Sequence, residues 1–237
     1  MERMHLKRLS EPKNWQSPFS SPVFLNPIKI DVSPHAVLKR LGRGVDAGKW
    51  LAPVEHVCAE FTPGIRPRGM YRLAFCRPNG LAIEVGKDHL FTSDFLKMNL
   101  PNPAVAAVFL VTIGSNLEED IKESTARKNN RSAFILDCLG SNAAESTAAA
   151  IHREVEKHTG LSMRRYSPGY NDWNIGEQEI LFDFLGRDNG KNLGVNLSSD
   201  YMMSPRKSVS GIILPRIEHS PRSFPKRMVS KSSRWTS

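Results

Sequence analysis

The feature that most constrains the fold is a long amphipathic segment that runs from Arg131 to His158. Apolar and small residues recur in it at spacings of three and four, which is the period of an α-helix with one buried face. This stripe consists of Leu136, Leu139, Ala143, Thr147, Ile151 and Val155. The roughly opposite face consists of Ser141, Glu145, Ala148 and His152. A helical glutamate is usually solvated, but small neighbours let a second segment pack closely, so we expect Glu145 to be partly desolvated.

Apolar runs elsewhere in the chain predict strands. The valine-rich run from Ala104 to Ile113 is typical of a strand buried within a sheet. Met70 to Cys76 and Leu81 to Val85 are joined through Pro78-Asn79-Gly80, and they predict a β-hairpin. Further helices are predicted over 33–42, 47–59, 93–98 and 177–185, the first opening at Ser33-Pro34. Together these elements predict an α+β fold, in which helices pack on a twisted, mainly antiparallel sheet.

The segment after the buried run has the sequence of a helix start. It contains one glycine, Gly114, so the Gly-x-Gly-x-x-Gly fingerprint of a nucleotide loop is absent. Ser115 is followed three residues later by Glu118, which predicts a capping box. Glu119 and Asp120 suit the positive end of the helix that would follow.

Irregular segments flank this core. Residues 1–27 contain four prolines and predict an irregular N-terminal arm, which leaves 28–214 as the domain. From Pro215 to Ser237 six lysines and arginines face one glutamate, which is +5 of the net charge of +9. This stretch has no apolar periodicity, so 215–237 is predicted to be a disordered basic tail. Such a tail could touch nucleic acid non-specifically, but no specific nucleic-acid site is predicted.

Several classes of protein are excluded by what the chain lacks. No apolar run approaches the roughly 20 residues that span a bilayer, and the N-terminus lacks the apolar core of a signal peptide. We therefore expect no membrane partner and a cytoplasmic location. Three scattered cysteines predict buried thiols, neither a disulfide framework nor a zinc site. No Gly-x-Ser-x-Gly elbow or His-Glu-x-x-His pair occurs, so no nucleophile or metal centre is predicted.

The loop Arg165-Tyr166-Ser167-Pro168-Gly169-Tyr170 has the residues of a binding turn. Pro168-Gly169 suits the centre of a type II turn, because the glycine accepts a positive φ. The turn would hold Arg165, which can fork onto a carboxylate, beside Tyr170, which offers a flat apolar face. An ordinary surface turn is the alternative interpretation of these six residues alone.

The sequence after this loop favours a binding turn over an ordinary surface turn. The Arg-x-x-x-Gly-Tyr loop is followed by the helical segment 177–185, then by Met203-Ser204-Pro205 and by Ser208-Val209-Ser210-Gly211. In this order and spacing the chain resembles the activation (reactivation) domain of cobalamin-dependent methionine synthase. The run Leu117-Glu118-Glu119-Asp120 extends the resemblance upstream, so that it covers roughly residues 104–214.

The resemblance implies a binding site for S-adenosylmethionine. Arg165 would take its carboxylate, and Glu145, which matches a family glutamate, would take its ammonium or face the sulfonium. Backbone groups near Ser167 and Gly169 would bond the adenine, and Tyr170 would cap the pocket toward a corrinoid. Ser208 and Val209 would form a further wall.

The resemblance also implies partners. The methyl group would rescue oxidised cobalamin that a partner carries, once a flavodoxin-like or ferredoxin-like electron donor has reduced it. The partner would be a cobalamin-binding methionine synthase or a related corrinoid protein. The chain itself lacks the Asp-x-His-x-x-Gly signature of proteins that ligate cobalamin through histidine, so we expect cobalamin only on the partner.

Two departures from the family leave other functions open. Asn171-Asp172-Trp173-Asn174 replaces a Pro-Ala-Cys-Pro-type segment, and Ile212-Ile213-Leu214-Pro215 continues directly into the basic tail. A docking module that has lost the cofactor pocket is therefore the alternative. A self-sufficient methyltransferase would need a glycine-rich loop, and a nucleic-acid binder would act through the tail.

Overall fold

The computed structural model describes residues 21–42, 44–101 and 104–217. Its main element is a seven-stranded antiparallel sheet, in the order β4-β3-β2-β5-β9-β6, with β1 paired to β2. The strands are β1 Val23–Leu25, β2 Arg68–Asn79, β3 Ala82–Val85, β4 His89–Thr92, β5 Ala104–Thr112, β6 Met163–Tyr166 and β9 Ser208–Pro215. A small separate ribbon pairs β7 Asn196–Leu197 with β8 Met203–Ser204.

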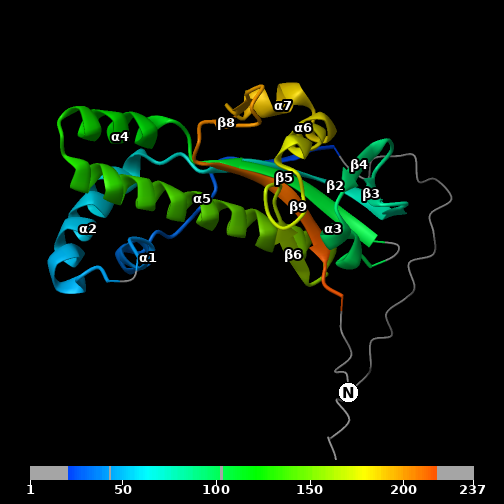
Figure 1. Ribbon diagram of the computed structural model, residues 1–237, viewed down its shortest axis with the longest axis horizontal. Coiled ribbons are helices and arrows are strands. Elements are labelled where there is room, and N and C mark those ends of the chain that lie inside the picture. Colours follow the sequence, from blue (N-terminus) through cyan, green and yellow to red (C-terminus); the bar gives the residue numbers. More distant parts are fainter. Residues whose placement is uncertain (1–20, 43, 102–103, 218–237) are drawn as a thin grey trace, which may run out of the picture.

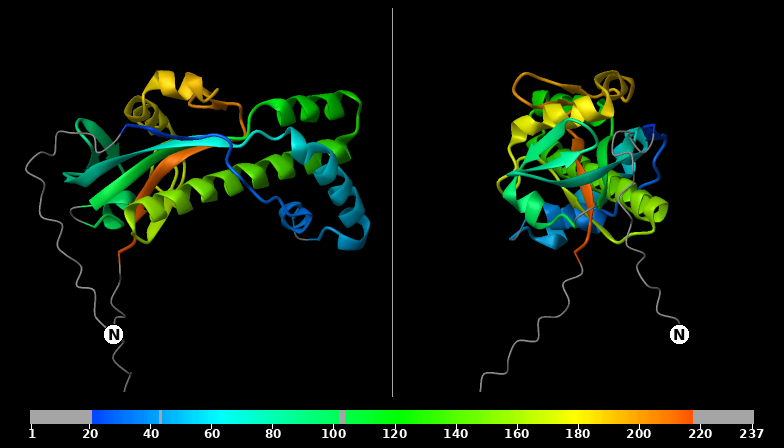
Figure 2. Two further views of the ribbon diagram at one scale, coloured as in Figure 1. Left: turned by 180° about the vertical axis from the view of Figure 1, so that it is seen from behind. Right: turned by 90° about the vertical axis from the view of Figure 1, so that its right-hand side faces the viewer.

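Helices cover both faces of the sheet (Figures 1 and 2). The helices are α1 Pro34–Arg40, α2 Ala47–Phe61, α3 Asp94–Met98, α4 Asn116–Ala126, α5 Asn130–Thr159, α6 Gln178–Leu185 and α7 Arg187–Asn192. Two short 3-10 helices are η1 Thr62–Gly64 and η2 Ile175–Glu177. Helix α5 packs on β2, β5 and β9 from one side, and α6 packs on β4, β5 and β9 from the other. The predicted α+β class is confirmed.

The position of the central strand β5 accounts for its apolar composition. Alternate residues of β5 enter two different cores, one beneath α6 that includes Val108 and Leu110, and one beneath α5 that includes Phe109 and Val111. Because both faces of β5 are covered, its sequence is continuously apolar, with no alternation of polar and apolar residues.

Helix α5 follows the predicted stripe and extends beyond the sheet. All six residues of that stripe are buried. The N-terminal half projects past the ends of the strands, where α1, α2 and α4 pack around it and form a third core (Figure 1). The helix ends at Gly160, whose φ of +68° is the left-handed conformation of a C-terminal cap. The longest pattern in the sequence is thus the element that joins the two halves of the fold.

Three sequence-based details are wrong. Val23–Leu25 was expected to be irregular, but it forms strand β1 against Gly69–Tyr71. Ser115 and Glu118 do not form a capping box: no side-chain cap bond forms, and Glu118 Oε1 instead accepts the Lys207 N–H at 3.1 Å. A tertiary contact therefore takes the carboxylate that the local pattern assigned to the helix end.

The third correction concerns the boundary of the basic tail. Strand β9 runs to Pro215, and the backbone N–H of Arg216 donates to the Ser162 carbonyl at 2.9 Å. Arg216 is thus part of the folded domain. The predicted arm before residue 21 and the predicted tail after residue 217 lie outside the described residues.

Candidate functional site

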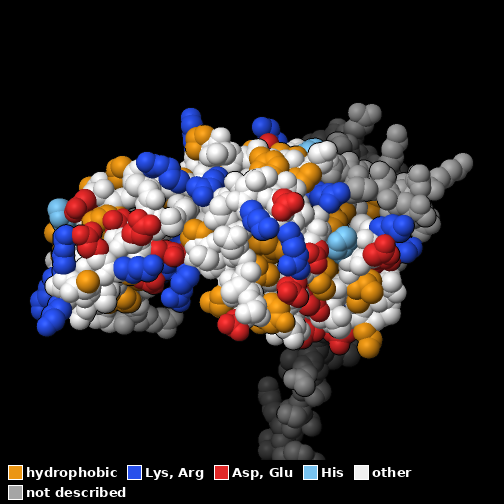
Figure 3. Space-filling model, turned by 90° about the horizontal axis from the view of Figure 1, so that it is seen from above, with side chains coloured by type: hydrophobic (Ala, Val, Ile, Leu, Met, Phe, Trp, Pro, Cys, Tyr) orange, Lys and Arg blue, Asp and Glu red, His pale blue; other side chains and the backbone are white. Residues whose placement is uncertain are grey.

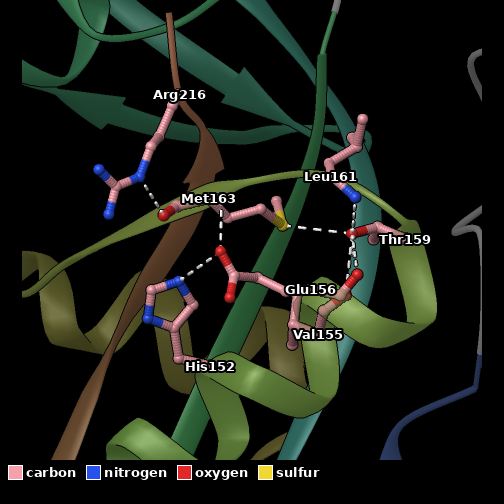
Figure 4. A network of polar contacts seen from close by, with 7 residues as sticks. All are labelled: His152, Val155, Glu156, Thr159, Leu161, Met163 and Arg216. Atoms are coloured by element: carbon pink, nitrogen blue, oxygen red, sulfur yellow. Dashed lines mark hydrogen bonds and ion pairs between the residues drawn. The ribbon is translucent and has the colours of Figure 1, made fainter. Parts of the chain in front are cut away.

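The strand that carries Arg165 is fixed to the end of α5 by a polar network (Figure 4). Glu156 Oε1 accepts the Met163 N–H at 2.9 Å, and the Met163 carbonyl accepts from Arg216 Nε at 3.0 Å. Thr159 Oγ1 donates to the Val155 carbonyl at 2.8 Å and lies 3.4 Å from Met163 Sδ. These contacts set the position of β6 relative to α5, although in the part of the chain that the structure describes β6 pairs with a single strand, β9.

The chain leaves β6 by passing very close to β9. Arg165 pairs with Ile213 and Tyr166 with Ile212. A Cβ added to the next β9 residue, Gly211, would lie 2.1 Å from the Tyr166 carbonyl oxygen and 3.0 Å from Ser167 Oγ. Only glycine permits this approach. Gly211 ends the Ser-Val-Ser-Gly motif, and the sequence alone indicated no role for it.

The turn that follows has the expected backbone at its centre. Gly169 has φ +85°, which confirms the predicted positive φ. Its N–H donates to the Trp173 carbonyl at 2.8 Å, which closes the loop. Tyr170, on the outer side, has 70% of its surface exposed.

Arg165 and Glu145 meet across the gap between β6 and α5. Arg165 Nη2 donates to Glu145 Oε2 at 2.6 Å, and the two side chains are 22% and 48% exposed. Arg165 Nη1 is buried and has no hydrogen-bond partner among the described residues. The two charges therefore lie side by side, with at least one strong donor unsatisfied.

These residues line a cavity of about 320 Å³. Its wall combines charged groups with aromatic rings, and Phe95 packs edge to face on Tyr166 at 5.5 Å between ring centroids. The lining residues are Phe95, Leu96, Glu145, Arg164, Arg165, Tyr166, Ser167, Tyr170, Asn171 and Trp173. Burial raises the pKa of the Tyr166 hydroxyl, opposed by the nearby Arg164 and Arg216. Helix α3, helix α5 and the loop after β6 together build a cavity that suits a ligand with charged and flat apolar parts.

Helix α3 is joined to the loop by Asp172. The carboxylate of Asp172 accepts from Ser93 Oγ at 2.6 Å and from the Asp94 N–H at 2.7 Å. The hydrogen bond from Ser93 is the largest cause that lowers the pKa of the Asp172 carboxyl, and hydrogen bonds from the α3 backbone lower it further. An anion at the first turn of a helix is favourable because the N–H groups there are unsatisfied.

The next residue, Trp173, anchors the loop from its buried side. Trp173 is 2% exposed, and its Nε1 donates to Glu177 Oε2 at 2.8 Å. Glu177 also accepts the Thr92 N–H at 3.0 Å. Burial raises the pKa of Glu177, while these hydrogen bonds oppose the shift. The segment that departs from the family thus supports the loop, a role that no local pattern in the sequence indicated.

Four of the seven predicted site residues, Glu145, Arg165, Ser167 and Tyr170, line the cavity, and Gly169 lies in its loop. Ser208 and Val209 do not line it. Ser208 Oγ instead bonds Thr112 Oγ1 at 2.9 Å and the Pro205 carbonyl at 2.7 Å, and Val209 packs against the core beneath α5. Ser208 is three residues from Gly211, about 10 Å at the rise of a strand.

Neither a membrane-spanning helix nor a metal site is found in the described residues. No helix there is long and apolar enough to cross a bilayer. No group of three or more potential metal ligands occurs in the same ranges. On the face seen in Figure 3, basic and acidic side chains are interspersed.

Comparison with known proteins supplies the family. The sequence model of the vitamin B12 dependent methionine synthase activation domain matches residues 81–224, more than half of the chain. The chain belongs to this activation-domain family. The recognisable motifs begin near residue 104, whereas the family match begins earlier, at residue 81.

A solved structure shares the fold of this activation domain. It is described as the crystal structure of the MetH reactivation domain bound to AdoHcy. It matches with a TM-score of 0.58 and 15% identity, over 84% of this chain and 79% of that chain. The comparison with curated proteins finds no match.

Proposed function

We propose that this chain binds S-adenosylmethionine in the cavity between α3, α5 and the loop after β6, and serves the reactivation of cobalamin on a partner protein. The observation that carries the proposal is the pairing of Arg165 with Glu145 in a mixed polar and aromatic cavity. It lies on the Arg-x-x-x-Gly-Tyr loop of a member of the activation-domain family. A related domain of known structure is described as bound to AdoHcy, the demethylated form of this ligand.

The residues present fit the chemical groups of the ligand. The guanidinium of Arg165 has donors left for the ligand's carboxylate, including Nη1, which has no hydrogen-bond partner among the described residues. Glu145 pairs with Arg165 at the same wall of the cavity, while Tyr166 and Phe95 offer apolar faces for the adenine. Ser167 and Gly169 present backbone groups at the turn. S-adenosylmethionine, when bound, supplies an activated methyl group, and the chain's residues hold and orient it.

The exposed position of Tyr170 at the cavity mouth fits a role toward a partner. We propose that the partner is a cobalamin-binding methionine synthase or a related corrinoid protein, and that cobalamin stays on that partner. A flavodoxin-like or ferredoxin-like protein would supply the electron. The proposed setting is the cytoplasm.

Calorimetric titration of the purified chain with S-adenosylmethionine tests the proposal. We expect saturable binding, and Arg165→Ala should weaken it by about 1.5–3 kcal/mol, or roughly 10- to 100-fold, because a charge-assisted contact is lost. Arg153→Ala, which removes the same charge from an exposed position on α5, is the control and should bind as the wild type does. No saturable binding by the folded wild-type chain, at several temperatures, would contradict the proposal.

A docking module without cofactor binding is the second candidate. It is favoured by the loop segment in which Asp172 and Trp173 are committed to internal hydrogen bonds. Two titrations distinguish the candidate functions. A docking module would bind a cobalamin-loaded partner and give no heat with S-adenosylmethionine.

A further inference from the structure

The two residues of the ion pair at the cavity come from elements of different kinds. Glu145 comes from the 30-residue helix α5. Arg165 comes from β6, which among the described residues is an edge strand paired with β9 alone. Among the residues that the structure describes, the Glu145 carboxylate is the acceptor recorded for the Arg165 guanidinium. The orientation of this arginine therefore depends on the glutamate.

The contact with Glu145 uses only part of the hydrogen-bonding capacity of the guanidinium. A guanidinium has five N–H donors in a planar fork, and Glu145 uses one of them through Nη2. A second carboxylate can still take two donors in a bidentate pair. Nη1 is a buried donor for which the described part of the chain supplies no acceptor, so an incoming acceptor improves the hydrogen bonding of the site.

We infer that Glu145 is a positioning residue, which acts on the ligand through Arg165 by holding its guanidinium ready for the ligand's carboxylate. This inference rests on the proposed function and deepens it. It differs from a direct contact between Glu145 and the ligand's ammonium, which the family resemblance implies. It also differs from competition, in which Glu145 would occupy the place of the ligand's carboxylate.

Two ligands distinguish these three roles. S-adenosylmethionine carries a carboxylate and an ammonium, whereas decarboxylated S-adenosylmethionine keeps the ammonium, the sulfonium and the adenine. In calorimetric titrations, Glu145→Ala should weaken S-adenosylmethionine about tenfold or more and leave the decarboxylated ligand within about twofold of wild type. Glu145→Gln should fall between, because its amide oxygen can still accept from Arg165 Nη2.

The double variant gives a second readout. If Glu145 acts through Arg165, then Arg165→Ala with Glu145→Ala should bind S-adenosylmethionine no more weakly than Arg165→Ala alone. Glu119→Ala, which removes an exposed carboxylate on α4, is the control for the change in net charge. Thermal melting of each variant separates loss of the fold from loss of binding, and the milder Glu145→Gln keeps the test available if the alanine variant is unstable.

Each contrary result has a different meaning. Equal weakening of both ligands by Glu145→Ala would overturn the positioning role in favour of a direct ammonium contact. Tighter binding of S-adenosylmethionine would overturn it in favour of competition. If the wild-type chain binds neither ligand, the proposed function itself fails.

Discussion

At the scale of single residues, the site depends on one glycine as much as on its charged groups. Gly211 lets the chain leaving β6 cross β9 at a separation that no side chain allows, since an added Cβ would overlap the Tyr166 carbonyl oxygen. Arg165 and Ser167 lie immediately on either side of that crossing. The approach of two backbones therefore sets where the charged fork and the turn begin.

Gly211→Ala should destabilise the fold, because the backbone of β6 cannot move as a flexible side chain could. We expect a loss of about 1–3 kcal/mol in the free energy of unfolding, as for overpacked cores, measured by urea denaturation. Gly64→Ala is the matched control, since a Cβ there meets nothing within 4 Å. Equal stability of the two variants would contradict this account of the crossing.

At the scale of elements, the loop after β6 is held by α3 as well as by the sheet. Asp172 binds the first turn of α3, and the lowered pKa of its carboxyl follows from those hydrogen bonds. A carboxyl whose pKa is lowered in the folded state stabilises that state above its unfolded pKa of about 3.9. That stabilisation is lost as the pH falls through the lower, folded pKa.

Asp172→Asn should therefore lower the melting temperature at pH 7, and the gap from wild type should shrink as the pH falls below about 4. Thermal melts of both proteins across that pH range measure the gap. Asp200→Asn, at an exposed loop position, is the control for the change in net charge. A gap for Asp172→Asn that stays constant with pH would show that the charge of Asp172 does not matter.

At the scale of the whole molecule, α5 and α6 pack on opposite sides of the sheet (Figure 1). The cavity is lined by Glu145, which lies near the middle of α5. Arg216 binds the Ser162 and Met163 carbonyls, so the end of β9 secures the strand that carries Arg165. The folded domain thus extends at least through this residue.

A chain that ends at Ile217 should keep the melting temperature and the S-adenosylmethionine affinity of the full chain. A chain that ends at Leu214 should lose stability and affinity, because the Arg216 contacts to β6 are gone. Calorimetry and thermal melts of both truncations measure this. If removing 218–237 abolishes S-adenosylmethionine binding, the tail belongs to the site. If the removal abolishes only nucleic-acid binding, the tail is a non-specific binder.

The sequence alone determined the local elements and the type of loop. The stripe of α5, the buried strand β5 and the positive φ of Gly169 follow from side-chain periodicity and backbone sterics, which act over a few residues. The order of motifs also indicated the family. These features could be predicted because each depends on its neighbours in the chain.

Only the tertiary structure decided which residues meet. Glu145 and Arg165 are 20 positions apart, and Asp172 and Ser93 are 79 apart. Their contacts depend on sheet register and on which face of a helix meets the sheet. The same register placed Ser208 away from the cavity and gave Glu118 to Lys207 in place of a capping box. Local patterns assign a side chain to an element, but the packing of elements chooses its partner.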